Sequence, residues 1–279
     1  MNNLLVFQSD FGLGDGAVSA MEGVSYGVCS KLNIRHLTHE ISPYNTFEAS
    51  YRLYQTINYW PEGTVFVSIV DPGVGSNRLS VVVKTKTNQY IVTPNNGTLT
   101  HINKFVGIDE VRVIDETVNR LKNSNESYTF HGRDVYAYTG ARLASNTITY
   151  EEVGPKVELD KIEMLELYGS HIEGNTVKGE IDILDVRFGS LWTSVTNEDF
   201  KSLGFNYGDN VKVEIFNSNK CVYQATIIYG HSFADVSVGA PVVYMNSVNH
   251  MAVAINQGNF ADAYRIGVGS AWLISFTKI

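Results

Sequence analysis

The stretch TVFVSIVDPGVGSNRLSVVVKT, residues 64–85, sets two apolar runs on either side of a glycine-containing loop. Apolar runs rich in valine and isoleucine, bounded by turn residues, are typical of buried β-strands. The loop carries a carboxylate at its start, Asp71, and a guanidinium at its far end, Arg78. A turn between two strands requires neither charge. The sequence therefore predicts strand, loop and strand, with a loop that does more than connect.

Outward from this stretch, the first half of the chain alternates between strand and helix patterns. Residues 4–10, 34–41 and 89–97 have strand patterns, 16–32 and 45–60 have helix patterns, and 128–146 predict a loop and a short helix. In the segment 16–32, Ala17, Met21, Val24 and Val28 fall on one helical face. This alternation predicts an α/β domain with a mostly parallel sheet, in which ligands gather at the carboxyl ends of the strands.

The second half of the chain has a different pattern, with short strands separated by glycine, asparagine and serine. Strands are expected within residues 178–190, 210–216, 221–230, 240–247 and 251–256. This pattern predicts an all-β domain, a sandwich or a small barrel. We expect an N-terminal α/β domain over residues 1–160, a linker over 161–169 and a smaller barrel-like domain over 170–279.

Composition restricts the partners. The chain of 279 residues is 44% hydrophobic and 18% charged with a net charge of -8, which indicates a globular protein that repels nucleic acid and anionic membranes. The N-terminus lacks the positive region of a signal peptide, and no apolar run is long enough to span a bilayer, so a cytoplasmic location is expected. Cys29 and Cys221 are expected to be buried free thiols, and no metal-ligand spacing occurs.

Polar side chains follow several of the expected strands. Asp10 and Asp15 follow the first strand, Asn95 and Asn96 end a later one, and Asp185 follows the first strand of the second domain. An isolated aspartate in such a place is commonly a turn or helix cap. Several of them in one chain also fit a shared site, and the sequence leaves both interpretations open.

The segment GLGDGA, residues 12–17, fits the glycine pattern of a dinucleotide-binding loop. Asp15 would then lie inside the loop that holds a pyrophosphate, with Asp10 just before it. Both carboxylates would repel the phosphates that a helix N-terminus attracts. The loop suits a ligand that offers hydroxyls or an ammonium group better than it suits a nicotinamide cofactor.

One histidine and several aromatic residues complete the candidates. His131 lies in a glycine-containing loop, where it is either structural or part of a polar triad with Asp71 and Arg78. Aromatic residues beside polar turns either pack under loops or form a slot for a purine ring. These aromatic residues are Tyr44, Phe130, Phe188, Trp192 and Phe233.

Seven ordered motifs together resemble the family of S-adenosylmethionine hydroxide adenosyltransferases, the adenosine-forming hydrolases related to the fluorinase and chlorinase. The motifs are SDFGLGD (9–15), VDPGVGSNR (70–78), TPNNGTL (93–99), FHGRD (130–134), DVRFGSLWT (185–193), SFADV (232–236) and NSVNHMAVAINQGNFA (246–261). The resemblance covers nearly the whole chain. It implies an N-terminal α/β domain, a C-terminal β-barrel and a homotrimer with active sites between subunits.

The resemblance also implies a reaction, the attack of water or hydroxide on the 5′-carbon of S-adenosylmethionine to give adenosine and L-methionine. Asp71, Arg78 and His131 match the triad that surrounds the attacking water in the hydrolases. The substrate itself is the only small molecule implied, with no cofactor and no metal. Whether Asp71 or His131 accepts the proton stays open. The alternatives are a halide-dependent relative, disfavoured by Asp71, and a non-catalytic binding protein.

For binding, the resemblance implies distinct roles for the remaining residues. Asp10 and Tyr44 correspond to the ribose site, while Asp15, Asp185 and Ser247 would face the methionine ammonium. The wall of the adenosyl part would be formed by Phe130, Phe188, Trp192 and Phe233. The chain departs from the family pattern at Ser190 and Ser194, where the family has asparagine. The loss of an amide places adenine affinity in question and leaves the reaction class unchanged.

Overall fold

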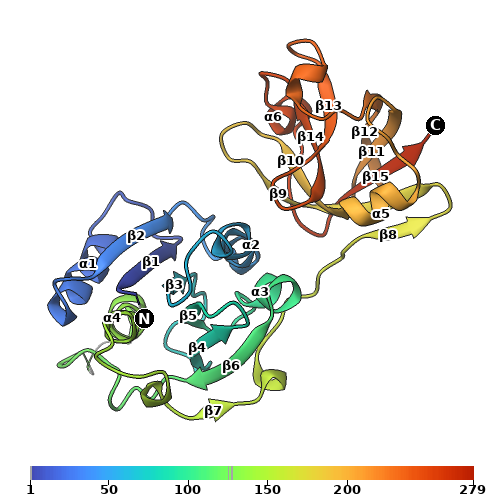
Figure 1. The fold of residues 1–279 in the computed structure, drawn as a ribbon. Helices are drawn as coiled ribbons and strands as arrows, with labels where there is room; N and C mark the ends of the chain where they lie inside the picture. Colours follow the sequence, from blue (N-terminus) through green and yellow to red (C-terminus); the bar gives the residue numbers. More distant parts are fainter. Residues whose placement is uncertain (1, 125, 127) are drawn as a thin grey trace. The chain divides into compact units, whose positions relative to one another are not determined.

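The computed structural model describes residues 2–124, 126 and 128–279, which divide into two compact units (Figure 1). The first unit is Met1–Leu165 and the second is Glu166–Ile279. Each has its own sheet and its own hydrophobic core. The α/β first unit and the barrel-like second unit confirm the predicted fold class.

The sheet of the first unit has the strand order β2-β1-β3-β5-β4-β6-β7. The pairings among β2, β1, β3 and β5 are parallel, whereas β5–β4, β4–β6 and β6–β7 are antiparallel, so the sheet is mixed. The parallel part contains the strands expected from alternating patterns. The strands are β1 (Leu4–Ser9), β2 (Asn33–Thr38), β3 (Val65–Ile69), β4 (Ser80–Thr85), β5 (Tyr90–Pro94), β6 (Ile108–Val113) and β7 (Lys156–Val157).

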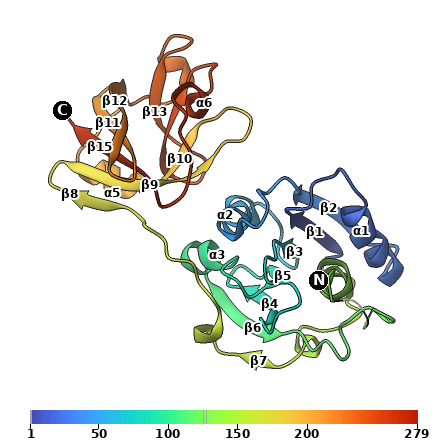
Figure 2. The ribbon, with the colours of Figure 1, turned by 180° about the vertical axis from the view of Figure 1, so that it is seen from behind.

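Helices cover both faces of this sheet, as the front and back views show (Figures 1 and 2). On one face lie α1 (Ala17–Val28) and a π-helical segment, η1 (Gly132–Ala137), which continues into α4 (Tyr138–Ala144). On the other face lie α2 (Thr46–Ile57) and α3 (Thr100–Phe105). The side chain of Asn45 caps α2 by accepting a hydrogen bond from the Glu48 amide at 3.0 Å. Short 3-10 turns, η2 (Glu151–Val153) and η3 (Leu159–Lys161), flank β7.

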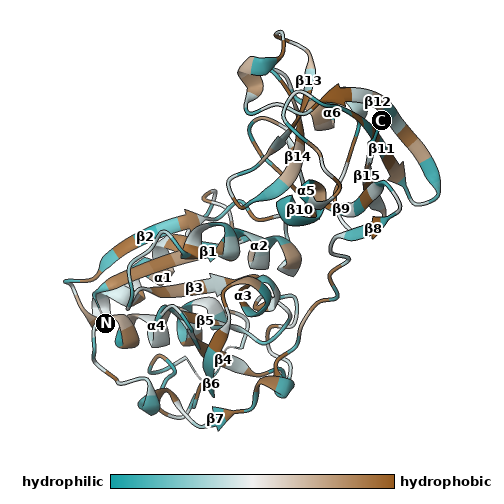
Figure 3. Ribbon diagram, turned by 45° about the vertical axis from the view of Figure 1, so that its right-hand side comes forward, coloured by the Kyte–Doolittle hydropathy of each residue, from teal (hydrophilic) through white to brown (hydrophobic). Residues whose placement is uncertain are grey.

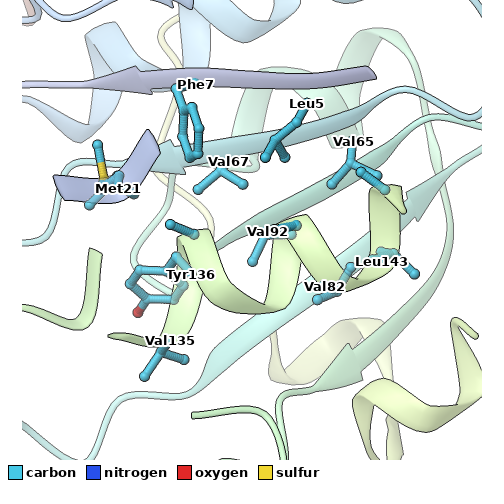
Figure 4. Close-up of a cluster of buried hydrophobic side chains, with 14 of the residues drawn as sticks. Leu5, Phe7, Met21, Val65, Val67, Val82, Val92, Val135, Tyr136 and Leu143 are labelled. Atoms are coloured by element: carbon cyan, nitrogen blue, oxygen red, sulfur yellow. The ribbon is translucent and has the colours of Figure 1, made fainter. Parts of the chain in front are cut away.

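Side-chain alternation along the strands builds two cores. Leu5 and Phe7 of β1 face α1 and α4, whereas Val6 between them faces α2 and α3. Figure 4 shows the first of these cores, in which Met21 and Tyr136 meet the strand residues. The hydropathy colouring shows that β1 is hydrophobic over most of its length, where the ribbon is brown (Figure 3). Strands buried on both faces explain the near-continuous apolar runs in the sequence.

Two local expectations require correction. Of the expected face of α1, Met21 is buried, whereas Ala17, Val24 and Val28 are only partly buried; Val18 and Ser25 are the other buried residues of this helix. Both cysteines are free, but Cys29 is half-buried and Cys221 is exposed. Burial was wrong for Cys221 because β12, which carries it, lies at the end of its sheet's strand order.

The second unit is an antiparallel sheet that curls into a nearly closed barrel. Its strand order is β12-β11-β15-β9-β10-β14-β13, and a bridge between Tyr229 and Val243 joins the two ends. Phe200 and Phe276 are fully buried in its core. The strands are β8 (His171–Glu173), β9 (Thr176–Leu184), β10 (Leu191–Thr196), β11 (Asn210–Asn217), β12 (Lys220–Ile228), β13 (Pro241–Met245), β14 (His250–Ile255) and β15 (Trp272–Lys278), with helices α5 (Asn197–Ser202), η4 (Phe233–Asp235) and α6 (Phe260–Tyr264).

Among the described residues, none of the helices combines the length and the apolar character that crossing a bilayer requires.

Candidate active site

A cavity of about 350 Å³ lies at the carboxyl ends of β1 and β3. These strands are parallel neighbours, so the residues that follow them emerge at one edge of the sheet. Asp10 follows β1 and Asp71 follows β3, and both line the cavity. Five of the residues predicted from the sequence meet here, namely Asp10, Tyr44, Asp71, Phe130 and His131.

The loop after β3 folds back so that its two charged ends meet. Arg78 Nε donates to Asp71 Oδ1 at 2.6 Å, and Arg78 Nη2 donates to Asp71 Oδ2, which gives a bidentate ion pair. The side chains are only 10% and 7% exposed, so the pair is poorly screened by water. Gly75 has a φ of +80°, a left-handed conformation that a glycine adopts without strain. The loop thus positions a carboxylate and its permanent counter-ion.

A buried tyrosine, Tyr136, contacts the Arg78 side of this ion pair. Arg78 Nη1 donates to Ser80 Oγ at 3.3 Å, and Ser80 Oγ lies 3.1 Å from the Tyr136 hydroxyl. The guanidinium also lies over the Tyr136 ring, 5.7 Å from its centroid. Burial raises the pKa of Tyr136 far above its ordinary value, so its hydroxyl stays neutral. Tyr136, which belongs to the core shown in Figure 4, therefore contacts both the Arg78 guanidinium and its partner Ser80.

The two asparagines of the TPNNGTL motif have structural roles. Asn96 Nδ2 donates to the Val70 carbonyl at 2.8 Å, which fixes the start of the loop that carries Asp71. Asn95 binds the later segment, donating to the Lys161 carbonyl at 3.0 Å and accepting from the Glu163 amide at 2.8 Å. Neither lines the cavity.

His131 lies directly before the π-helical segment η1 and is only 6% exposed. Its Nε2 lies 3.0 Å from Arg120 Nη2, and Arg120 in turn donates to Glu116 Oε2 from Nε at 3.2 Å and Nη2 at 2.9 Å. Burial lowers the pKa of His131; Glu116 opposes this shift and Arg120 adds to it. The imidazole is thus neutral near pH 7. π-helical segments are frequent at functional sites.

Tyr44 and Asp10, which also line the cavity, are joined by a hydrogen bond from a backbone amide to a side chain. The Tyr44 amide donates to Asp10 Oδ2 at 2.8 Å. Tyr44 has a φ of +67°, an uncommon conformation for an aromatic residue, and its side chain is 74% exposed. An exposed ring on a strained backbone beside a carboxylate fits a ligand-binding position.

Beneath Asp10 a chain of hydrogen bonds reaches the surface. Ser9 Oγ lies 2.7 Å from His39 Nδ1, His39 Nε2 lies 2.7 Å from His36 Nδ1, and His36 Nε2 lies 2.8 Å from Glu22 Oε1. Burial, with a smaller contribution from His36, lowers the pKa of His39 to about 4. Every ring nitrogen in this chain has a partner when both histidines are neutral.

Asp15 lies apart from the cavity lining. It is exposed, and its Oδ1 accepts a hydrogen bond from the Ala17 amide at 2.8 Å at the start of α1. The N-cap of α1 is Gly16, so the Asp15 bond is a turn bond, the turn role that the sequence left open for an aspartate after a strand.

In the second unit, Phe188 and Phe233 line a separate cavity of about 550 Å³ with Arg187, Asn256 and Gln257. The two rings are 67% and 42% exposed, so their faces are open to a ligand. Gly189, next to Phe188, has a φ of +62°, and a Cβ there would lie 1.7 Å from Asn259 Oδ1. Only glycine fits this turn, which presents Phe188 to the cavity.

The remaining predicted residues of the second unit fall into two groups. Ser190 and Trp192 are 2% and 8% exposed, and both form hydrogen bonds with the Tyr244 hydroxyl. Burial raises the pKa of Tyr244, and these two hydrogen bonds oppose part of that rise. Asp185 is half-buried and Ser247 is exposed in the turn between β13 and β14. None of these four lines the cavity of Phe188 and Phe233.

Ser194, where the family resemblance led us to expect asparagine, has a structural position. Its hydroxyl donates to the Gly169 carbonyl at 2.6 Å and accepts from the Glu180 amide at 2.9 Å. It is therefore occupied in joining β10 to β9 and to the segment before β8.

Within the part of the chain that the structure describes, no group of three histidine, cysteine or acidic side chains is arranged to hold a metal ion. The cavity beside Asp71 contains one carboxylate already paired with arginine and a second bonded to a backbone amide.

Three residues of this site were missed by the sequence reasoning: Glu116, Arg120 and Tyr136. Glu116 and Arg120 are four positions apart, the spacing of an ion pair on one turn of helix, and this was the available signal. Tyr136 was included in an expected short helix without a role. Tyr136 belongs to the site through its contact with Ser80, which lies 56 positions away in the sequence.

Comparison with known proteins places the chain in a family. Residues 5–154 match the SAM hydroxide adenosyltransferase N-terminal domain, and residues 179–273 match the C-terminal domain of the same family. An (R)-S-adenosyl-L-methionine hydrolase of Methanocaldococcus jannaschii is 34% identical over 78% of this chain and 75% of its own length. A fluorinase of Actinopolyspora mzabensis is 27% identical over 95% of each chain.

Solved structures agree with this placement. A conserved protein from Thermotoga maritima superimposes with a TM-score of 0.90 at 31% identity, covering 99% of this chain and 100% of that one. A conserved protein from Thermus thermophilus gives a TM-score of 0.74 at 27% identity, with 98% and 99% coverage. The two matched domains together span most of the sequence, and the chain therefore belongs to the SAM hydroxide adenosyltransferase family.

Proposed function

We propose that this protein is an enzyme that hydrolyses S-adenosyl-L-methionine to adenosine and L-methionine. The observation that carries the proposal is the buried Asp71–Arg78 pair with His131 on the wall of the same cavity. Relatives named as (R)-S-adenosyl-L-methionine hydrolases, at 28–34% identity, support it.

The reaction is a displacement at carbon. The oxygen of water or hydroxide forms a bond to the 5′-carbon, the bond from that carbon to sulfur breaks, and the electron pair goes to sulfur to give the thioether of methionine. A sulfonium is a good leaving group because it leaves as a neutral molecule. The protein therefore has to place the oxygen in line with the carbon–sulfur bond and to limit its hydration.

We assign the positioning of the oxygen nucleophile to the locked polar residues. Asp71 keeps lone pairs on both oxygens after pairing with Arg78, and these accept a hydrogen bond from water. Arg78 holds the carboxylate in place and, being permanently charged, favours an anionic nucleophile nearby. His131 is neutral near pH 7, so its ring supplies a further hydrogen bond.

We assign substrate binding to the remaining predicted residues, each described within its own unit. Asp10 has one oxygen bonded to the Tyr44 amide and the other available to a ribose hydroxyl, with the Tyr44 and Phe130 rings beside it. Phe188 and Phe233 are assigned to the adenosyl part because their exposed faces suit a purine. Asp15, Asp185 and Ser247 are assigned to the methionine ammonium. Ser190 and Trp192 are buried, and we assign them an indirect role, in which their hydrogen bonds hold the Tyr244 side chain.

A halide-dependent adenosyl transferase is the second candidate, because the fluorinase relative matches 95% of the chain. In such an enzyme a halide occupies the place of water. The Asp71 carboxylate at the cavity wall disfavours this, because it repels an anion that cannot donate a hydrogen bond back.

Product analysis tests these functions. The purified protein is incubated with S-adenosylmethionine alone, with chloride and with fluoride, and the products are separated by chromatography and identified by mass. We expect adenosine and methionine in equal amounts in every arm. A halogenated 5′-deoxyadenosine that requires halide would support the transferase, and retained substrate without any product would support a binding protein.

We further propose a homotrimer in the cytoplasm with active sites between neighbouring subunits, as the family resemblance implies. The mass of the chain is 31.0 kDa, so a trimer has three times this mass, 93 kDa. Light scattering coupled to size exclusion measures this directly. A mass of 31.0 kDa at assay concentration would contradict the trimer.

A further inference from the structure

The contact between Arg120 and His131 determines where the imidazole carries its proton. Arg120 Nη2 lies 3.0 Å from His131 Nε2, and a guanidinium has only donor groups. Nε2 must therefore accept this hydrogen bond through its lone pair. In a neutral imidazole with Nε2 as acceptor, the hydrogen resides on Nδ1.

Glu116 fixes Arg120 in the orientation that imposes this arrangement. Its Oε2 accepts from both Nε and Nη2 of Arg120, and Arg120 also lies over the Tyr128 ring, 5.0 Å from the centroid. The Arg120 side chain is only 5% exposed. A guanidinium held on three sides in this way has little freedom to release Nε2.

The other ring nitrogen, His131 Nδ1, is buried and has no hydrogen-bond partner among the described residues. A buried N–H normally has a partner, either in the protein or in water. His131 lines the same cavity as Asp71, where the nucleophile of the proposed reaction has to lie. We therefore assign the oxygen of the attacking water as the partner of Nδ1–H.

We propose that Arg120 is a positioning residue that holds His131 as an Nδ1–H donor, so that His131 orients the attacking water and Asp71 receives the water's proton. This inference rests on the proposed hydrolysis. It resolves the choice of base, because the Nε2 lone pair of His131 is taken by Arg120 and Nδ1 already carries a hydrogen.

In the proposed step the water molecule bridges His131 and Asp71. The oxygen of water accepts from Nδ1–H and donates one hydrogen to a carboxylate oxygen of Asp71. As the oxygen–carbon bond forms and the carbon–sulfur bond breaks, that hydrogen passes to Asp71 as a proton and the electron pair of the broken bond stays on sulfur. Asp71 then returns the proton to solvent.

The first test observes the tautomer directly in the unmodified protein. Protein labelled with nitrogen-15 in histidine is examined by long-range proton–nitrogen correlation at about pH 7.5, where an unperturbed histidine is mostly neutral. The His131 signals are assigned from their loss in His131→Asn. We expect hydrogen on Nδ1 and a bare Nε2. Hydrogen on Nε2 would overturn the inference.

Two variants of His131 separate a donor from a base. The amide of asparagine falls near the position of imidazole Nδ1, and that of glutamine near Nε2. A donor role predicts that His131→Asn loses about tenfold in kcat and His131→Gln about a hundredfold. Equal losses in the two variants would contradict the donor role.

Two variants of Arg120 test its action through His131. Arg78 and Arg120 lower the pKa of His131, whereas Glu116 and Asp71 raise it. In Arg120→Met the donor to Nε2 is lost, so the nitrogen-15 spectrum should show hydrogen on Nε2 as well as on Nδ1, and kcat should fall; Arg120→Lys, which keeps a donor and the charge, should restore hydrogen to Nδ1 alone. A folded Arg120→Met protein whose ring keeps hydrogen on Nδ1 alone would overturn the positioning role.

Failure of the inference differs from failure of the proposed function. If the protein shows no turnover but His131 carries hydrogen on Nδ1, the hydrolase proposal fails and the action of Arg120 on the ring stands. If turnover occurs and His131 carries hydrogen on Nε2, the hydrolase proposal stands and the inference fails.

Discussion

The two units present their candidate residues in different ways. In the first, the polar groups are hydrogen-bonded to one another in the absence of a ligand, as Asp71 is to Arg78 and His131 is to Arg120. In the second, Phe188 and Phe233 stand at the surface without comparable restraint. Groups that take part in a chemical step need fixed geometry, whereas rings that bind a flat ligand need an open face.

The architecture explains this difference. Parallel strands of an α/β unit bring their carboxyl ends to one edge, where short loops lie over a packed core. The turns of a barrel extend from its ends and have fewer neighbours. Replacing a residue in the first unit should therefore affect rate or stability, and replacing one in the second should affect substrate affinity.

Asp71→Asn should have the largest effect. The amide keeps the size of the side chain but loses the charge that pairs with Arg78 and the ability to accept a proton. We expect kcat to fall about a thousandfold, with adenosine affinity changed less than tenfold. Steady-state kinetics and calorimetry of adenosine binding measure the two quantities. A near-normal kcat would contradict the assignment of the catalytic step to Asp71 and the first unit.

Acid should destabilise the first unit through His39. Its pKa is about 4 in the folded protein, below the ordinary 6.5, so the unfolded chain binds more protons between these values. Stability is therefore complete above pH 6.5 and declines as the pH falls towards 4, by as much as about 3 kcal/mol.

Urea unfolding followed through Trp60, in a protein with Trp192→Phe and Trp272→Phe, reports this loss for the first unit. His39→Gln, which cannot titrate, is the matched control and should flatten the dependence over that range. An equal pH dependence with and without the imidazole would assign the effect to other groups.

Phe188→Ala and Phe233→Ala should change affinity alone. Stacking on a base is worth roughly 1–3 kcal/mol, so each change should raise KM about tenfold. Because the rings are 67% and 42% exposed, their removal should leave the melting temperature nearly unchanged. If either variant lowers kcat as strongly as Asp71→Asn does, the second unit also takes part in the chemical step, and the division of roles between the units is wrong.

Asp15→Asn should give the smallest effect and separates two roles. The asparagine oxygen still accepts from the Ala17 amide, so the melting temperature should change by less than about 2 °C. If Asp15 also faces the substrate ammonium, KM rises a few-fold because the charge is lost. An unchanged KM would leave Asp15 with its turn bond to Ala17 only.

Much of the fold was predictable because burial leaves a clear pattern. Apolar runs such as 64–70 and 79–85 gave strands of the first unit, and the change to short strands predicted the second. The antiparallel placement of β4 between β5 and β6 has no local signal, because strand order depends on contacts distant in sequence. Strands β6, β7, β8, β10 and β15 were missed, β10 because its LWTSVT run follows directly on a turn motif.

The candidate site divides in the same way. Asp71 and Arg78 share one loop, so their approach was visible as an unusual pair of charges at its ends. The contact of Arg120 with His131 depends on where each residue is held. Asn119, next to Arg120, is held by a distant bond, from its Nδ2 to the Val153 carbonyl at 2.9 Å. Such bonds join segments with no common pattern in the sequence.

The position of the new oxygen atom tests the central claim most directly. The protein is incubated with S-adenosylmethionine in water enriched in oxygen-18, and the products are examined by mass spectrometry. Attack of water at the 5′-carbon beside Asp71 predicts one heavy oxygen per adenosine, at the 5′ position, and none in methionine. Unlabelled adenosine, or label confined to a fragment of the methionine chain, would contradict the account.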